Sequence, residues 1–427
     1  MELDRAIALA RRRLVPFLLL MYIISFLDRA NIGFAKQSFQ ADVHISDAAY
    51  ALGAGLFFLS YALLEVPSNL AMHRVGARLW MCRIMVTWGL ISAAMMFVSN
   101  ATWFYILRLL LGAAEAGFFP GVILYLTYWF PDRVRGQIMG LFYFGAPLAF
   151  IFGGPLSGVL LELDGVAGLK GWQWMFLIEG LLASIVGVWA YWYLDSKPSE
   201  ARWLPPAEKQ ALLAAIGREE HSRGEHGPAA LGGAFTNPRV LLFIAIYFLI
   251  QMSVYGVVFY LPSQVAQLLG TKVGLEVGLV TAIPWICAII AAYALPRAAD
   301  RSGSHRVIAA ATLAVSGIGI AVSAASGPAL ALIALCFAAA GFIAVQPMFW
   351  TFPTGYLSGV AAAGEIALIN ALGALGGFVA PNVKNWADVS FGSASAGLYV
   401  LAATTIVGAI LIAGMPGQRK VALAIPQ

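Results

Sequence analysis

Long segments of this chain are hydrophobic on every side of any element they could form. Runs such as 15–27 and 241–250 show neither the two-residue alternation of a strand nor the polar face of a surface helix. About 20 apolar residues are needed for a helix to cross a bilayer, and twelve segments reach that length. Their spacing predicts transmembrane helices at residues 14–35, 48–72, 79–99, 101–127, 136–162, 174–194, 239–262, 275–297, 305–325, 328–356, 361–386 and 391–414.

One long polar stretch separates the sixth hydrophobic segment from the seventh. It carries charges of both signs and has a tail rich in Gly and Pro. The chain therefore divides into an N-terminal six-helix bundle at 1–194, a cytoplasmic linker at 195–238 and a C-terminal six-helix bundle at 239–427. The predicted fold class is an all-α membrane protein with twelve transmembrane helices in two bundles.

A short polar element follows the second hydrophobic segment of each half. In the first half it runs from Asn69 through Arg74 to Arg78, and in the second half it carries Asp300 and Arg301. A similar element at the same place in both halves is typical of transporters built from an internal duplication. We therefore expect the two bundles to be pseudo-symmetric, and we expect Arg74, Asp300 and Arg301 to have a gating or structural role.

The composition agrees with a protein embedded in a membrane. Hydrophobic residues make up 61% of the chain and charged residues 11%, whereas soluble domains have roughly 45–50% and 25%. The net charge of +5 could suggest nucleic acid, but 20 of the 26 Lys and Arg residues fall on one side of the predicted helices. On the other side fall only Lys36, Lys170, Lys272 and Lys384. The positive-inside rule then places both termini in the cytoplasm, and no nucleic-acid partner is expected.

Four charged residues lie deep within predicted spans, and a charge at the middle of the membrane costs about 2.5–3.5 kcal/mol. They are Asp28 and Arg29 in the first span and Arg108 and Glu115 in the fourth. Arg108 and Glu115 are seven residues apart, nearly two helical turns, and therefore share one face of their helix. Such costly residues normally face a cavity or a partner, which leaves two interpretations: a functional site, or two ion pairs that lock helices together.

The types of these four residues indicate binding of an anion together with protons. An arginine keeps its charge and presents a fork of donors that matches a carboxylate, so Arg29 and Arg108 are candidate substrate residues. A buried carboxyl favours its protonated form, so Asp28 and Glu115 are candidate proton-coupling residues. An organic anion among the four groups leaves an excess of negative charge, which proton uptake by one or both acids would balance. The hypothesis is proton-coupled symport.

Five polar or amphipathic residues near the middle of other spans are further candidates for contact with a substrate. Any one of them could instead be a packing residue whose polar tip has found a neighbour. They are Tyr61, Gln251, Tyr255, Trp350 and Asn370. The hydrophobic pattern around them leaves both interpretations open.

Three more acids lie in or near the spans. Glu65 precedes Pro67 toward the cytoplasmic end of its span, which indicates a solvated structural role. Glu179 lies near the start of the sixth span and indicates hydrogen bonding between helices. Glu365 lies about five residues to the cytoplasmic side of Asn370 in a run of small and aliphatic residues. It could reach cytoplasmic water, or it could serve as a gate or a third titratable group.

The sequence contains no signature of catalysis, of a cofactor or of a metal site. Walker A, HExxH, a GxSxG nucleophile with its partners and a dinucleotide-binding loop are all missing. The three cysteines, Cys82, Cys287 and Cys336, lie in apolar runs without metal-ligand spacing. We therefore expect no enzymatic activity, no cofactor and no metal.

The repeated polar element resembles the signature loop of the major facilitator superfamily. The second copy keeps Asp300 and Arg301, whereas the first has Asn69 at the glycine position and His73 at the aspartate position. The resemblance implies the twelve-helix fold of that superfamily, in which two halves rock about a central site and expose it to each side of the membrane in turn.

Other segments resemble one branch of this superfamily, the anion:cation symporter family. The likeness extends over essentially the whole chain and is carried by FLDRANIGFA at 26–35, the segment 108–121, YWFP at 128–131, WTFPT at 350–354 and ALIN at 367–370. This branch contains bacterial carriers for sugar acids such as galactonate and glucarate, for tartrate and for phthalate. It is related to the vesicular and lysosomal organic anion transporters of animals.

The resemblance also implies roles for single residues. The family's proton-binding acids correspond to Asp28 and Glu115, and its substrate and coupling arginines correspond to Arg29 and Arg108. The cavity positions that contact the substrate in this family correspond to Tyr61, Trp350 and Asn370. The chain departs from the family at Ala146, where sugar-acid carriers can have a glutamine. It departs again at Glu365, where a small residue is expected.

We therefore expect a proton-coupled symporter that imports a small organic carboxylate, such as a sugar acid or tartrate, across a bacterial inner membrane. Its partners would be the organic anion, protons and the lipid bilayer, and we expect it to act as a monomer. Two alternatives stay open. One is an organic-anion exchanger or effluxer, which the Gly- and Pro-rich stretch 153–158 favours. The other is a membrane sensor that binds the anion without transporting it.

Overall fold

The computed structural model describes residues 1–223, 237–357 and 361–415, and helices make up the regular structure of these residues. The first half contains α1 (Glu2–Val43), α2 (Asp47–Val75), α3 (Ala77–Ala94), α4 (Ala101–Glu115), α5 (Phe118–Trp129), α6 (Asp132–Tyr143), α7 (Gly145–Leu161) and α8 (Gly171–Tyr193). After these follow α9 (Pro206–Arg223), α10 (Pro238–Val258), α11 (Leu261–Leu269), α12 (Leu275–Ser302), α13 (His305–Ala325), α14 (Pro328–Tyr356), α15 (Ala361–Ala374), α16 (Gly376–Ser390) and α17 (Ala396–Ala413).

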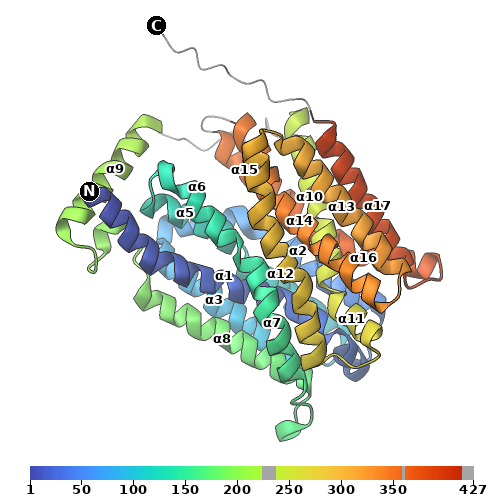
Figure 1. The fold of residues 1–427 in the computed structure, drawn as a ribbon. Helices are drawn as coiled ribbons and strands as arrows, with labels where there is room; N and C mark the ends of the chain where they lie inside the picture. Colours follow the sequence, from blue (N-terminus) through green and yellow to red (C-terminus); the bar gives the residue numbers. More distant parts are fainter. Residues whose placement is uncertain (224–236, 358–360, 416–427) are drawn as a thin grey trace.

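The helices form two groups that lie side by side (Figure 1). In the first group α3 packs against α8, α2 against α4, and α1 against α7 and α8. In the second group α13 packs against α14 and α17, α12 against α14, and α10 against α15, α16 and α17. The predicted all-α fold in two bundles is therefore confirmed.

Eleven stretches of the described residues are long and apolar enough to cross a membrane, and they correspond to the second to twelfth predicted spans. Four of these spans consist of two successive helices: α4–α5, α6–α7, α10–α11 and α15–α16. The hydrophobic pattern predicted these spans but not the breaks inside them. The second helix in each pair begins next to a residue that breaks or weakens a helix, namely Gly117, Gly145, Pro262 and Gly376.

The first predicted span, 14–35, lies within α1, a helix outside those eleven stretches. α8 lies beside α1 along the whole length of α8. The Tyr193 hydroxyl donates to the Arg13 carbonyl at 3.0 Å near one end, and the Trp172 indole N–H donates to the Asp42 carboxylate at 2.9 Å near the other. Because α8 is long and apolar enough to cross a membrane, α1 covers the same depth and supplies the twelfth span.

The linker contains more structure than the sequence indicated. α9 lies within it and packs against α1 and α5. Leu212 of α9 is fully buried, and Glu208 forms an ion pair with Arg5 of α1 at 3.5 Å. This part of the linker is a helix docked on the first group and not a solvated chain. The Gly- and Pro-rich tail at 224–236 lies outside the described residues.

The two groups meet closely on one side of the molecule. We call the side that carries the N-terminus and α9 the terminal side, and the opposite side the far side (Figure 1). On the far side α7 approaches α12 so closely that a Cβ atom on Gly278 would lie 2.3 Å from the Gly154 carbonyl oxygen. Across the same contact the Leu275 N–H donates to the Glu162 carboxylate at 2.9 Å. These contacts close the far side.

Candidate functional site

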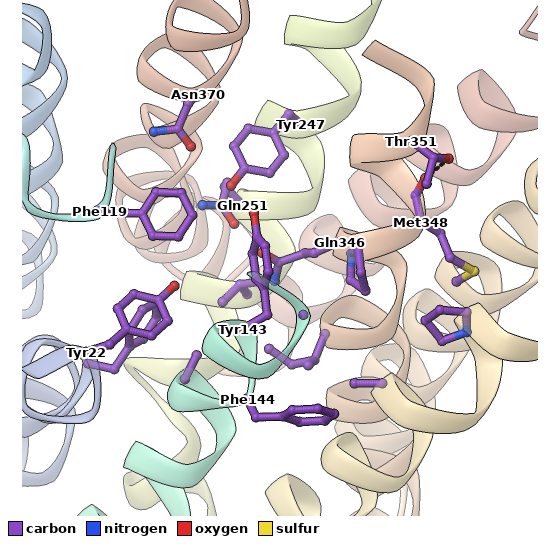
Figure 2. Close-up of a pocket in the computed structure, with 18 of the residues that line it drawn as sticks. Tyr22, Phe119, Tyr143, Phe144, Tyr247, Gln251, Gln346, Met348, Thr351 and Asn370 are labelled. Carbon is purple, nitrogen blue, oxygen red and sulfur yellow. Dashed lines mark hydrogen bonds between the residues drawn. The ribbon is translucent and has the colours of Figure 1, made fainter. Parts of the chain in front are cut away.

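A cavity of about 490 Å³ lies between the two groups of helices. Both groups contribute to its lining, in which tyrosine and phenylalanine rings alternate with amide side chains (Figure 2). Asp300 and His305, at the junction of α12 and α13, line the cavity on the terminal side. Because Asp300 is exposed there, the cavity is open to the terminal side while the far side is closed.

The guanidinium of Arg29 lies in the wall of this cavity and joins the two groups. Its Nε and Nη2 donate to Glu115 Oε1 at 2.8 and 2.6 Å, and its Nη1 donates to the Tyr255 hydroxyl at 3.1 Å. The ring centres of Phe26 and Tyr61 each lie 5.0 Å from the guanidinium carbon. One cation therefore holds a carboxylate of the first group and a phenol of the second.

A break in the fourth span places Glu115 beside Arg29. Glu115 is the last residue of α4, and the chain turns at Gly117, which has a φ of +86°. A Cβ atom on Gly117 would lie 2.3 Å from the Ser68 hydroxyl, so this turn requires glycine. Glu115 is 1% exposed, and its Oε2 has no hydrogen-bond partner among the described residues. That oxygen is a place where a proton can bind.

Asp28 precedes Arg29 in the chain but lies outside the cavity lining. Its carboxylate accepts hydrogen bonds from the Ser92 hydroxyl at 2.7 Å, from the Asn31 amide at 3.1 Å and from the Trp88 indole N–H. These partners belong to α1 and α3, so Asp28 is held inside the first group. Within the described part of the chain it forms no ion pair.

Arg108 also lies outside the cavity lining. It is 1% exposed and donates to the backbone carbonyls of Gly53 at 3.2 Å and Ala54 at 3.1 Å, both in α2. Its guanidinium lies 5.1 Å from the ring centre of Phe57. Of the four charged residues singled out in the sequence, the structure brings only Arg29 and Glu115 into contact, and Arg108 joins α4 to α2.

Apart from Arg297, Asp300 and His305 on the terminal side, the second group contributes neutral polar side chains to the cavity. Gln251 and Tyr255 of α10 line it, and so does Tyr247. Gln346 of α14 lines it as well, and Figure 2 shows the three labelled side chains Tyr247, Gln251 and Gln346 around the same space. Gln346 was not among the predicted site residues, although an amide just before Pro347 in the tenth span is the kind of signal that identified Gln251.

Several aromatic residues of the first group line the cavity without having been singled out. They are Tyr22, Phe119, Tyr143 and Phe144 (Figure 2). Aromatic residues are common in hydrophobic spans, so nothing in the sequence separates those that face a cavity from those that pack against a helix. Tyr61 and Ala146, which the sequence analysis did single out, also line the cavity.

A hydrogen bond between the two groups lies at the edge of the cavity. Asn370 of α15 lines the cavity and donates from Nδ2 to Glu65 Oε1 of α2 at 2.7 Å. Glu65 is completely buried, so the solvated role predicted for it is wrong. The reason is that α15 packs on this part of α2, a contact that the hydropathy of α2 alone could not reveal.

Three other candidates lie outside the cavity lining. Trp350 packs edge-on against Tyr247 with ring centres 5.0 Å apart, and its buried indole N–H has no partner among the described residues. Glu365 is half-buried near the start of α15. Glu179 is fully buried and accepts from the Ser157 hydroxyl at 2.7 Å, which confirms the predicted hydrogen bonding between helices and shows that the partner lies in the fifth span.

The repeated polar element lies on the terminal side in both halves. Arg74 and Arg301 are exposed there. Asp300 lies 2.7 Å from His305 Nε2 where the cavity opens. A gating or structural role for Arg74, Asp300 and Arg301 stays a prediction.

Comparison with known proteins decides the family. The Major Facilitator Superfamily profile matches residues 18–381. This chain belongs to the major facilitator superfamily. The inner membrane transport protein RhmT of Escherichia coli strain K12 is 50% identical over 420 residues, which are 98% of this chain and 97% of RhmT. A putative tartrate transporter of Agrobacterium vitis is 43% identical over 401 residues, which are 93% of this chain and 88% of that protein.

A solved structure of another transporter shares the fold. It is a bacterial homologue of the human lysosomal transporter Spinster, in an inward-facing and occupied conformation. It superposes with a TM-score of 0.73 over 94% of this chain and 95% of its own, at 14% identity, so the likeness concerns the fold alone. The predicted major facilitator fold is confirmed. The protein is a multi-pass membrane transporter of small organic metabolites, in a family of transporters and not of enzymes.

Proposed function

We propose that this transporter is a proton-coupled symporter that carries a small organic carboxylate into a bacterial cell across the inner membrane. The proposal rests on the contact between Arg29 and Glu115, 2.6 Å long, in the cavity wall. A substrate carboxylate that binds Arg29 must share or replace the bond to Glu115. The binding of the anion and the charge of Glu115 are therefore linked through one cation.

This link gives a physical reason for an anion to enter with a proton. Arg29 and Glu115 neutralise one another, so a bound carboxylate adds an unbalanced negative charge where the dielectric constant is low. A proton on Glu115 removes that charge and frees the guanidinium donors for the substrate, with which they can form strong charge-assisted hydrogen bonds. Asp28, buried without an ion pair among the described residues, offers a second proton site.

The rest of the lining favours a substrate with hydroxyl groups and a single carboxylate. The amides of Gln251, Gln346 and Asn370 line the cavity and can exchange hydrogen bonds with uncharged hydroxyl groups. Arg29 is the buried cation of the lining, but Glu115 already shares it, and the other lining arginine, Arg297, is exposed on the terminal side near Asp300. A sugar acid with one carboxylate therefore fits this balance of charge better than a sugar acid with two.

We place the terminal side in the cytoplasm, because 20 Lys and Arg residues fall on that side of the predicted topology and four on the other. The described state is then open to the cytoplasm, and opening of the far side would admit substrate from outside. Both walls of the cavity come from the same chain, so a monomer completes the site. The names of the relatives, an inner membrane transport protein and a putative tartrate transporter, support the location and the carboxylate class.

Thermal-shift measurements on the purified protein test the ligand class, because a bound ligand stabilises the folded state by mass action. The panel contains D-galactonate, D-glucarate, L-tartrate and phthalate, each at an acidic and a neutral pH. Galactonate and glucarate have the same number of carbon atoms, and they differ in the number of carboxylates and in the configuration at C4. We expect galactonate to raise the melting temperature more than glucarate, and more strongly at acidic pH. A panel in which no acid shifts the melting temperature at either pH would contradict the proposal.

Uptake into proteoliposomes tests the coupling. A symporter accumulates the acid when an inward proton gradient is imposed and stops when the gradient is removed. An organic-anion exchanger instead runs counterflow at full rate without the gradient, and a sensor binds the acid without any flux. Accumulation that depends on the proton gradient is the expected result.

A further inference from the structure

Glu65 is a buried carboxyl that the proposed transport cycle does not yet use. It is completely buried in α2 and forms no ion pair within the described part of the chain. Its Oε1 accepts the hydrogen bond from Asn370 Nδ2 at 2.7 Å, and its Oε2 has no partner among the described residues. The carboxyl thus depends on one donor, and this donor belongs to the other group of helices.

The charged and titratable groups that face Glu65 come from three helices. They are Arg29 of α1, Tyr61 one turn earlier in α2, and Tyr247 of α10. Arg29 is already engaged by Glu115 at 2.6 Å. Asn370 is therefore the neighbour whose contact can stabilise a charge on Glu65 directly.

Asn370 also lines the cavity, so its amide is within reach of a ligand as well as of Glu65. An ionised carboxylate that loses its hydrogen-bond donor in an apolar site becomes unfavourable, and a proton removes the charge. A ligand hydroxyl or carboxylate that takes the Asn370 N–H would leave Glu65 in that position. Binding at one residue would then change protonation at the other.

We infer that Glu65 is a further proton-binding site of this transporter, and that Asn370 links its protonation to the binding of substrate. The proton binds at Oε2, the oxygen without a partner. When Asn370 returns to Glu65 after substrate release, the carboxylate regains its donor and the proton leaves. The inference rests on the proposed function for the identity of the ligand, but the presence of a titrating proton on Glu65 does not depend on it.

Infrared difference spectra of the purified protein during a pH titration test the proton site without any ligand. The wild-type protein is compared with Glu65→Gln, which keeps the size of the side chain and an acceptor for Asn370. We expect the wild type to show a carboxyl band that titrates and that is missing in Glu65→Gln. In Asn370→Ala we expect a larger protonated fraction at neutral pH, because the ionised form has lost its donor.

Glu179→Gln is the matched control. Glu179 is also fully buried with one hydrogen bond, from Ser157, and one oxygen without a partner among the described residues. Neither Glu179 nor its partner Ser157 lines the cavity, whereas Asn370, the partner of Glu65, does. The carboxyl band of Glu179, identified by its loss in Glu179→Gln, should therefore not respond to a ligand. The Glu65 band should grow when galactonate, or the panel acid with the largest thermal shift, is added at fixed pH.

The outcomes separate this inference from the proposed function. If Glu65→Gln shows the same titrating bands as the wild type, Glu65 has a structural role only and the inference is wrong. The same holds if Glu65→Gln removes a band whose intensity changes neither with pH nor in the Asn370→Ala variant. If the Glu65 band titrates but no acid of the panel binds, the proton site stands and the proposed substrate class falls. The expected result is that the Glu65 band grows with ligand in the wild type and that the ligand causes no such growth in Asn370→Ala.

Discussion

The two halves of this transporter share an architecture but distribute their polar residues differently. The buried charged residues of the membrane part of the first half are Asp28, Arg29, Glu65, Arg108, Glu115 and Glu179. In the second half the described residues include one buried charge, Lys384, which pairs with Asp388 at 2.7 Å outside the cavity lining. The second half instead lines the buried part of the cavity with the amides Gln251, Gln346 and Asn370, and its charged lining residues Arg297 and Asp300 are exposed on the terminal side.

This difference indicates a division of roles between the halves. Charges are costly inside a membrane, and placing them in one bundle allows cations and carboxylates to balance one another. The neutral amides and hydroxyls of the second bundle can select a substrate by its uncharged groups. Two hydrogen bonds connect the halves at the cavity, from Arg29 to Tyr255 and from Asn370 to Glu65. Movement of one half against the other therefore acts on the charged residues directly.

The largest effect is expected from removing the cation of the first half. Arg29→Ala should lower uptake about 30-fold or more, since loss of a buried charge partner costs about 2–5 kcal/mol or more. Initial rates in proteoliposomes measure the effect. Arg218→Ala, which removes an exposed arginine on α9, is the control and should transport normally. Comparable rates in both variants would show that the anion does not bind at Arg29.

A second change acts on the contact between the halves and leaves the cavity-lining residues of both halves unchanged. Valine at Gly278 would clash with the Gly154 carbonyl, and overpacking of this kind costs about 1–3 kcal/mol. Gly278→Val should therefore shift the population toward the state that is open on the far side. Distances between spin labels at the far ends of α7 and α12 should lengthen. Gly327→Ala, where an added Cβ meets no atom within 4 Å, should leave the distances unchanged.

A smaller effect is expected from removing one amide of the second half. Gln251→Ala and Gln346→Ala should each weaken ligand binding about fivefold to tenfold, because one hydrogen bond contributes about 1 kcal/mol. If the halves divide their roles as described, the dependence of binding on pH should not change. Calorimetric titrations at two pH values measure both quantities. A loss of pH dependence in either variant would break the distinction between the halves.

The smallest effect is expected at Trp350. Trp350→Phe keeps an aromatic ring against Tyr247 and removes an indole N–H that has no partner among the described residues. Ligand affinity should change by no more than about twofold, since no hydrogen bond is lost. A loss of tenfold or more would mean that the indole turns into the cavity in another state of the cycle and contacts the substrate.

The fold could be predicted from the sequence because long apolar segments allow few structures in a membrane. Backbone groups in the hydrocarbon region must be paired within the segment, so a 20-residue apolar run predicts a helix reliably. The breaks at Gly117 and Gly376 were missed because glycine is common in continuous transmembrane helices as well. The docking of α9 was missed because its apolar residues, such as Leu212, form one short run at 211–216 inside an otherwise polar stretch.

The site could be predicted only in part. The cost of buried charge identified Arg29, which lines the cavity, and Glu115, which contacts Arg29 from outside the lining. The polar or amphipathic character of residues in the middle of spans identified Tyr61, Gln251 and Asn370, which all line the cavity. Hydropathy along one helix does not show which neighbour covers a residue. For that reason the contact of Arg108 with backbone carbonyls and the contact of Glu65 with Asn370 could not be foreseen.

Proton movement driven by an anion gradient tests the division of roles most directly. Proteoliposomes receive an inward gradient of galactonate, or of the panel acid with the largest thermal shift, and the external pH is recorded for wild type, Glu115→Gln and Glu276→Gln. Glu276 is exposed at the start of α12 and serves as the control. We predict that wild type and Glu276→Gln take up protons with the anion, while Glu115→Gln takes up fewer protons for each anion, because only the proposed sites Asp28 and Glu65 remain. Proton uptake by Glu115→Gln equal to that of wild type would contradict the account, because the charge of Glu115 would then play no part in coupling.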